Sequence, residues 1–300
     1  MERGRKMTEN SYKTPCGCIH YFVNIMDKQR ITLVFLPGLT ADHRLFEKQI
    51  EYFENKQNVF VWDAPSHALS RPFANSYRLS DMAEWLYKIL VKEEIYNPII
   101  IGQSMGGYLA QMYMELYPDK ITGFISIDSA PLQKSYMTAV EIWLLERVEP
   151  LYRIYPWKAL LRAGSRGCSE TDYGQNLMRK MMMAYDLDHK EYARLAGFGY
   201  RMLAEAIKAD LPYHISCPAL LICGENGISR NAVSIRHTEK ECGYPESAHG
   251  IRAGLHTMVP EVCPVTRKIT ACVYSRQEKN ITVTCRHRII SEQDILSENF

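Results

Sequence analysis

Short apolar runs rich in β-branched residues alternate with longer helical patterns along this 300-residue chain. The alternation predicts a mostly parallel sheet covered by helices, because neighbouring parallel strands need a crossover connection that is usually a helix. Helical spacing of the apolar residues predicts helices over 81–91 and 106–117. The expected strands are 31–36, 59–62, 99–101, 122–127 and 219–223. We therefore expect an α/β fold.

The alternation stops between residues 131 and 215, where long helical patterns rich in Met, Leu, Tyr and Arg replace it. We interpret 131–215 as a helical cap inserted into an α/β core made of residues 1–130 and 216–300. Met181, Met182 and Met183 lie in this cap. Methionine adapts to irregular space, so these three side chains suit the roof of a pocket or the ordinary core of the cap, and the ordinary core is favoured.

The charge balance is nearly even, with 36 Lys and Arg against 34 Asp and Glu. This composition provides no basic stripe for nucleic acid or for an anionic membrane, so a small-molecule partner is expected. No run approaches the roughly 18 apolar residues that span a bilayer, and no signal-peptide pattern follows the polar start of the chain. We expect a soluble, cytoplasmic protein; the sequence leaves its oligomeric state open.

Nine cysteines are scattered along the chain. An odd number without a framework of spacings is typical of reduced thiols in a cytosolic protein. Only Cys16 and Cys18 lie close together, and no second pair at zinc-site spacing accompanies them. A position at a strand edge is therefore favoured over a metal site, and we expect neither a metal nor a cofactor.

The segment Gly102-Gln103-Ser104-Met105-Gly106 fits the pattern G-x-S-x-G and lies between an expected strand and an expected helix. That context is the one in which the pattern forms a nucleophile elbow. A serine on such an elbow has strained backbone angles, and the flanking glycines let the chain pass without side-chain clashes. Ser104 is the expected catalytic nucleophile.

A second candidate element is the segment Leu36-Pro37-Gly38-Leu39-Thr40, at the end of the strand 31–36. Backbone N–H groups can stabilise the oxyanion of a tetrahedral intermediate. The amide of Met105 follows the nucleophile, and the amide of Leu39 is placed to be the second donor. The alternative is that Pro37-Gly38 merely turns the chain.

Four segments together resemble the α/β-hydrolase family, specifically its capped esterase-like and peptidase-like members, over about residues 12–225. The segments are FLPGLTADHRLFEKQ, VWDAPSHALSRP, IIIGQSMGGYLAQMYMELYP and CPALLICGE, and they occur in the family's order and spacing. Asp63, His67 and Ser70 match a turn that is structural in the family, so the resemblance argues against His67 as the catalytic base.

The resemblance also implies a catalytic acid, but the chain departs from the family pattern at the usual acid position. The family usually has Asp two residues after the Glu of the Gly-Glu pair, and this chain has Gly227 there. Some family members take the acid from the position of Asp128, after the strand 122–127. We expect Asp128 to be the acid; the alternative is that it caps the following loop.

The histidine that the resemblance implies is also unsettled. His256 lies at about the family's distance from the expected strand 219–223 and is our candidate for the base; His249, His287 and His237 are rivals. The pattern weakens abruptly after Glu225, beyond which 269–274 and 281–285 alternate like hairpin strands and 291–300 suits a short helix. One hypothesis explains both departures: the segment 225–300 is not the family's native C-terminus, through a change of reading frame.

These features predict a serine hydrolase that cleaves an ester, amide or thioester through an acyl-enzyme on Ser104. A serine rather than an aspartate at the elbow argues against dehalogenase or epoxide hydrolase chemistry, which the same fold supports. The alternative is a catalytically silent small-molecule binder, or a hydrolase with a defective C-terminal segment. The sequence does not specify the substrate.

Overall fold

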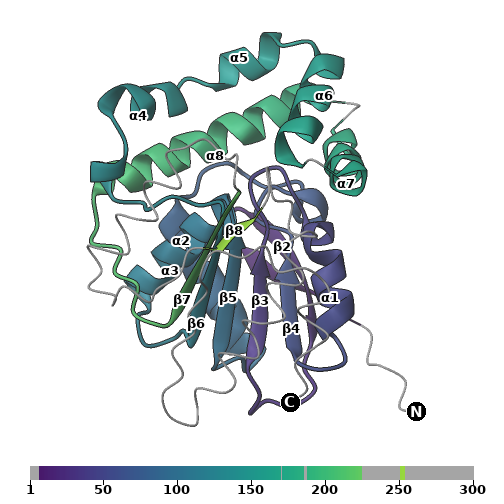
Figure 1. Ribbon diagram of the computed structural model, residues 1–300, viewed down its shortest axis with the longest axis vertical. Coiled ribbons are helices and arrows are strands. Elements are labelled where there is room, and N and C mark those ends of the chain that lie inside the picture. Colours follow the sequence, from purple (N-terminus) through teal and green to yellow (C-terminus); the bar gives the residue numbers. More distant parts are fainter. Residues whose placement is uncertain (1–6, 170, 186–187, 225–250, 254–300) are drawn as a thin grey trace.

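The computed structural model describes residues 7–169, 171–185, 188–224 and 251–253 (Figure 1). Within these residues the strands form one eight-stranded sheet in the order β1-β2-β4-β3-β5-β6-β7-β8. All neighbours from β4 to β8 pair in parallel, which confirms the expected mostly parallel sheet. The parallel strands are β3 (Thr32–Leu36), β4 (Asn58–Trp62), β5 (Pro98–Gln103), β6 (Gly123–Ile127), β7 (Ala219–Gly224) and β8 (Ile251–Ala253).

An antiparallel hairpin extends the sheet at its N-terminal edge. Its strands are β1 (Thr8–Thr14) and β2 (Gly17–Asn24), and β2 also pairs antiparallel with β4. Cys16 lies in the turn between them and Cys18 lies on β2. Neither cysteine forms a disulfide in the part of the chain that the structure describes.

Two apolar cores lie on opposite faces of the sheet. Every residue of β3, β4 and β6 is buried, because helices cover both faces of these central strands. Val34 and Leu36 contribute to the core under α2 (Leu79–Lys92) and α3 (Met105–Leu116). Leu33 and Phe35 contribute to the core that contains residues of α1 (Glu47–Phe53).

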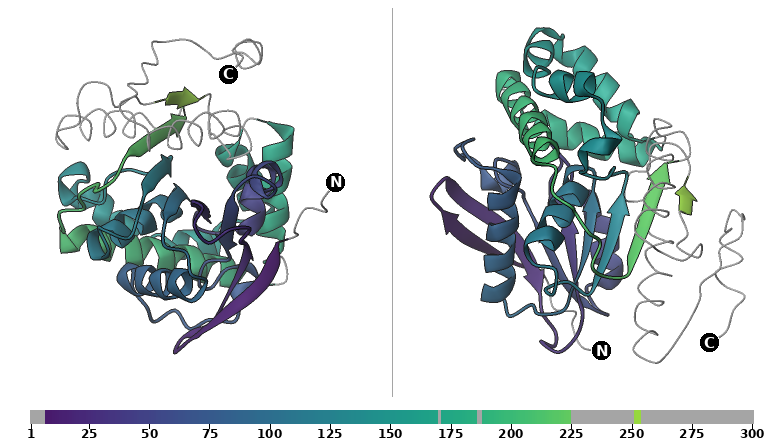
Figure 2. Two further views of the ribbon diagram at one scale, coloured as in Figure 1. Left: turned by 90° about the horizontal axis from the view of Figure 1, so that it is seen from below. Right: turned by 90° about the vertical axis from the view of Figure 1, so that its left-hand side faces the viewer.

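Among the described residues, five α-helices and a short 3-10 helix stand between β6 and β7, at the place of the expected cap. Figure 1 shows them as a layer across the carboxyl ends of the parallel strands, and Figure 2 shows from the side that they cover one end of the sheet. The longest, α8, lies beneath α4 and α5 (Figure 1). The elements are η3 (Lys134–Tyr136), α4 (Ala139–Leu145), α5 (Glu149–Ile154), α6 (Trp157–Cys168), α7 (Asp172–Met183) and α8 (His189–Ala209).

The methionine run in α7 packs mainly into the apolar core between the cap and the sheet. Met181 and Met182 are buried in the core that α7 shares with the sheet, whereas Met183 is half exposed. None of the three lines the pocket described below, so the ordinary-core interpretation fits this run.

In the described ranges, no helix is both long enough and apolar enough to cross a membrane. The expected strands 269–274 and 281–285 and the expected helix 291–300 lie outside the described residues.

Candidate active site

Ser104 occupies a sharp turn between the end of β5 and the start of α3. Its backbone angles are φ 48° and ψ −114°, a conformation that is uncommon for a residue with a side chain. The Ser104 N–H donates to the carbonyl oxygen of Ile127 at 2.8 Å, and the Ser104 carbonyl accepts from the N–H groups of Gly107 and Tyr108. These bonds join the turn to β6 and to the first turn of α3. The expected elbow is therefore present, with Ser104 half-buried at its tip.

The elbow lies so close to β3 that one of its flanking positions has no room for a side chain. A β-carbon on Gly106 would overlap the backbone carbonyl of Leu36. Ser129 adds a further bond, because its hydroxyl donates to the Ser104 carbonyl at 2.8 Å. The motif predicts the glycine but not Ser129, whose only signal in the sequence is its place two residues after β6.

The loop after β3 passes over the elbow. A β-carbon on Gly38 would lie 3.1 Å from the backbone oxygen of Gln103 and 3.2 Å from the β-carbon of Ser104. Leu39, which follows Gly38, and Met105, which follows Ser104, line the same pocket. The structure thus brings the two expected oxyanion residues to the lining of one small pocket.

His67 holds the loop after β3 through a hydrogen bond to its backbone. The N–H of Thr40 donates to Nε2 of His67 at 2.9 Å, and Nδ1 of His67 lies 2.9 Å from the carbonyl oxygen of Pro65. Nε2 must accept and Nδ1 must donate, so the ring is neutral with its proton on Nδ1. Burial lowers the pKa of His67, which agrees with this assignment. Both ring nitrogens are engaged, and His67 is a structural residue rather than an available base.

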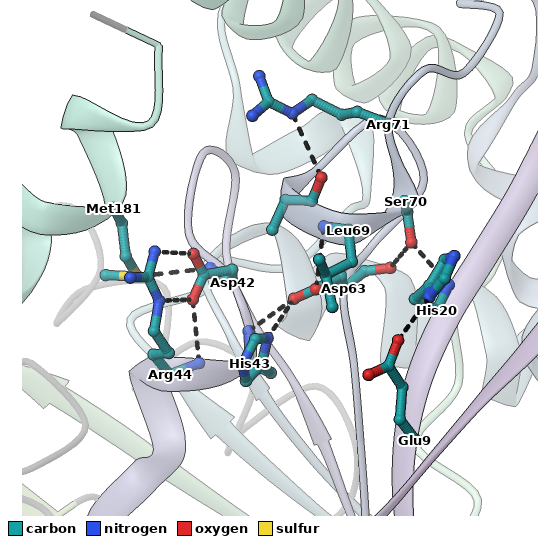
Figure 3. A network of polar contacts seen from close by, with 11 residues as sticks. Glu9, His20, Asp42, His43, Arg44, Asp63, Leu69, Ser70, Arg71 and Met181 are labelled. Carbon is teal, nitrogen blue, oxygen red and sulfur yellow. Dashed lines mark hydrogen bonds and ion pairs between the residues drawn. The ribbon is translucent and has the colours of Figure 1, made fainter.

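Asp63 organises the turn that carries His67 (Figure 3). Its Oδ1 accepts from the backbone N–H of His43 at 2.9 Å and lies 2.8 Å from the Nδ1 of the same histidine; its Oδ2 accepts from the N–H of Leu69. Ser70 donates to the Asp63 carbonyl at 2.7 Å and accepts from the N–H of His20 on β2. This network joins the turn to β2.

Asp42, His43 and Asp63 together resemble a metal-ligand set, since one ligand atom of each lies within 4.8 Å of the others. Each side chain already has a protein partner: Arg44 binds Asp42 with Nε at 2.9 Å and Nη2 at 2.6 Å, and His43 binds Asp63. Burial opposes protonation of His43, but the hydrogen bond and charge of Asp63 raise its pKa. The hydrogen bond between His43 and Asp63 and the ion pair of Asp42 with Arg44 account for the close approach of the three side chains.

Asp128 follows β6 at the same edge of the sheet. Gln103 and Ile127 are paired in register. The residues that follow them, Ser104 and Asp128, therefore lie next to each other at the ends of neighbouring strands. Asp128 is half-buried with φ 51°, and its N–H donates to the Ile222 carbonyl of β7 at 2.9 Å. This position is compatible with the expected role of Asp128 as the acid.

The expected base, His256, lies outside the described residues, as do its rivals His237, His249 and His287. Gly227, at the family's usual acid position, also lies outside them. In the described part of the chain, His67 is the one histidine that lines the pocket.

The pocket itself is small and lies between the core and the cap helix α8. Its walls come from the loop after β3, the end of β4 and the turn that follows it, the start of α3, and α8. The lining residues are Pro37, Gly38, Leu39, Trp62, Ala64, His67, Tyr77, Met82, Met105, Gly106, Leu109, Leu195, Phe198, Gly199 and Met202.

Residues 31–170 match the family model described as the alpha/beta hydrolase fold. Two curated proteins are similar over shorter stretches. The magnesium-chelatase 30 kDa subunit of Rhodobacter capsulatus is 33% identical over 93 residues, which cover 30% of this chain and 33% of that protein. The 3-oxoadipate enol-lactonase 2 of Acinetobacter baylyi is 26% identical over 101 residues, covering 34% of this chain and 38% of that protein. Each match spans well under half of the relative.

The structural likeness extends further than the sequence likeness. A crystal structure reported for carboxylesterases of the ammonia-oxidizing Thaumarchaeon Nitrososphaera gargenis superimposes with a TM-score of 0.66, covering 89% of this chain and 100% of that one. The two sequences are 16% identical, so this likeness establishes the fold alone.

Proposed function

Because residues 31–170 match the alpha/beta hydrolase fold model, we propose that this chain is a serine hydrolase that cleaves an ester, amide or thioester of a small molecule. The observation that carries the proposal is the strained, half-buried Ser104, over which the Gly38–Leu39 loop passes. Strain of this kind persists where the surrounding structure holds it, and it gathers at catalytic sites. The hydrogen bond that Ser104 donates to Ile127 and the one that its carbonyl accepts from Ser129 provide that support.

In the proposed reaction the Ser104 hydroxyl attacks the carbonyl carbon of the substrate. The hydroxyl proton passes to a histidine, and the carbonyl oxygen becomes an oxyanion that accepts from the amides of Leu39 and Met105. The tetrahedral intermediate then collapses: the leaving group departs with the proton, and the acyl group remains on Ser104. Water, deprotonated by the same histidine, releases the acid product.

We propose His256 as the base and Asp128 as the acid that orients it. The register of β5 and β6 supports Asp128, because it puts this residue beside Ser104 at the carboxyl edge of the sheet. His256 rests on the family resemblance of its sequence context, and His249 and His287 are its rivals. Substituting the true base should reduce kcat by several orders of magnitude, about as much as loss of the nucleophile.

Two similar proteins support ester chemistry by their names, since a lactonase and a carboxylesterase both hydrolyse esters. We also propose a small-molecule acyl substrate without nucleic-acid or membrane partners, which the nearly even charge balance favours. The scattered, odd number of cysteines favours a cytoplasmic site of action.

The second candidate is a catalytically silent binder with the same fold, favoured by Gly227 at the usual acid position. Hydrolysis of a panel of acyl esters of increasing chain length separates the two functions. The matched variants are Ser104→Ala and Ser135→Ala, the latter altering an exposed serine of η3. We expect Ser135→Ala to retain full activity and Ser104→Ala to retain none above background. A folded wild-type protein that hydrolyses no ester, or equal activity in both variants, would favour the binder.

A further inference from the structure

The small pocket beside Ser104 is lined by uncharged, mostly apolar residues. Among the described residues that line it, none is Asp, Glu, Lys or Arg. Leucine, methionine and aromatic side chains dominate the lining, and α8 contributes Leu195, Phe198 and Met202 from the cap. A charged group placed here would lose its hydration without gaining a partner, so these walls select against it.

The two titratable side chains in the lining are also unavailable to a charged ligand. His67 uses both ring nitrogens inside the protein, as described above. The Tyr77 hydroxyl donates to the Pro65 carbonyl at 3.0 Å and lies 3.2 Å from the Ser66 hydroxyl. Neither group can compensate a negative charge on a ligand.

Trp62 differs from His67 and Tyr77, whose polar atoms have hydrogen-bond partners within the protein. Its side chain is fully buried at the end of β4 and lines the pocket. Its indole Nε1 has no hydrogen-bond acceptor among the described residues. A buried tryptophan N–H ordinarily finds a partner, because an unpaired buried donor is costly. An acceptor brought by a ligand would remove this cost.

Resting on the proposed function, we propose that this pocket receives the acyl group of the substrate. We further infer that the acyl group is uncharged and apolar except for one acceptor oxygen, which the indole N–H of Trp62 recognises. The acyl group stays bound through the acyl-enzyme stage while the leaving group exits, so it suits this mostly apolar pocket between the core and α8. Met82, Met105 and Met202 surround the space, and their flexible side chains can move to admit the group.

Three p-nitrophenyl esters test this inference: the butyrate, the methoxyacetate and the hemisuccinate. The methoxyacetyl group replaces one methylene of the butyryl group by an ether oxygen, and the succinyl group carries a carboxylate in place of its terminal methyl group. For the wild-type protein we expect kcat/KM for the hemisuccinate to be at least about tenfold below that for the butyrate, since an uncompensated charge is strongly disfavoured. Comparable values for these two esters would overturn the assignment of an uncharged acyl group.

The variant Trp62→Phe keeps an aromatic ring and removes the N–H. We expect it to lower the ratio of kcat/KM for methoxyacetate over butyrate about five- to tenfold, the equivalent of one hydrogen bond. Comparing the same ratio in two proteins cancels the intrinsic reactivity of the esters. Trp143→Phe is the matched control, because Trp143 is 52% exposed on α4, and it should leave the ratio unchanged. An equal ratio in Trp62→Phe and the wild type would overturn the role of Trp62.

The wild-type protein provides an independent measurement should Trp62→Phe not fold. The p-nitrophenyl methylthioacetate carries a sulfur, a weak acceptor, in place of the ether oxygen. For each ester, kcat/KM is divided by its rate constant for alkaline hydrolysis. The resulting value should be higher for the methoxyacetate than for this thioether; an equal or lower value would contradict the inference. Absence of all hydrolysis, with Ser104 unlabelled by a fluorophosphonate, would overturn the proposed function and this inference with it, whereas hydrolysis without the expected preferences overturns this inference alone.

Discussion

The backbone N–H of Thr40 donates a 2.9 Å hydrogen bond to Nε2 of His67, and this bond joins the loop above the elbow to the turn after β4. Thr40 itself has φ 65°, an uncommon angle for a β-branched residue. The bond therefore holds a strained loop, and Leu39 directly precedes the residue that makes it. The position of the proposed Leu39 donor thus depends on a histidine that has no part in the chemistry.

Replacing this histidine should damage both stability and activity. His67→Phe leaves the buried Thr40 N–H without an acceptor, and we expect a loss of about 1–3 kcal/mol in the free energy of unfolding. Activity should fall through kcat rather than KM, because the oxyanion donor acts mainly in the transition state. Urea denaturation and ester kinetics measure the two effects. The matched variant His214→Phe changes an exposed histidine and should alter neither; equal behaviour of the two variants would contradict this role of His67.

His67 and His43 should give stability opposite dependences on pH. The pKa of His67 lies below the usual value of 6.5, so its contribution is present above that value and is lost as the pH falls below it. The pKa of His43 lies above 6.5, so its contribution is present below that value and is lost as the pH rises through the raised pKa.

Urea midpoints between about pH 5 and pH 8, the range over which histidine titrates, test this contrast. The stability difference between wild type and His67→Phe should shrink as the pH falls. The difference between wild type and His43→Gln should grow. Two differences that change in parallel with pH would show that the assigned protonation states are wrong.

The cap should influence catalysis partly through a close approach of α8 to the loop after β3. A β-carbon on Gly199 of α8 would overlap the side chain of Leu39. Gly199→Ala must therefore displace Leu39, and we expect about a tenfold loss of kcat with a stability loss of about 1–3 kcal/mol from overpacking.

Gly167→Ala in α6 is the matched control for this substitution. Its β-carbon would meet nothing within 4 Å, and alanine is a better helix former than glycine. This variant should gain about 0.5–1 kcal/mol and keep its activity. If Gly199→Ala kept wild-type kcat, the cap would not set the position of the Leu39 loop.

Much of the central sheet follows from the sequence because its strands are buried on both faces. The runs 31–36, 59–62 and 122–127 are nearly continuous apolar segments, and each lies within one residue of the observed β3, β4 and β6. The hairpin of β1 and β2 is not among the sequence-based expectations, although Ile19, Tyr21 and Val23 alternate with less buried neighbours in β2. Such alternation is the usual signal of a strand with one covered face.

Only part of the candidate site can be predicted from the sequence. The elbow at Ser104 is predictable because its motif is local and its flanking strand and helix have clear periodicities. The contacts of Thr40 with His67 and of Ser129 with Ser104 join segments 27 and 25 residues apart, and no local pattern encodes them. That the N–H of Trp62 finds no acceptor among the described residues is visible only in the three-dimensional structure.

The central claim is that the Ser104 hydroxyl is a working nucleophile, and labelling by a fluorophosphonate tests it most directly. Intact-protein mass spectrometry followed by peptide mapping should find one phosphonyl adduct on Ser104 of the wild-type protein and none on Ser104→Ala. Ser135→Ala should be labelled like the wild type. A folded wild-type protein that stays unlabelled, or equal labelling of Ser104→Ala, would contradict the claim.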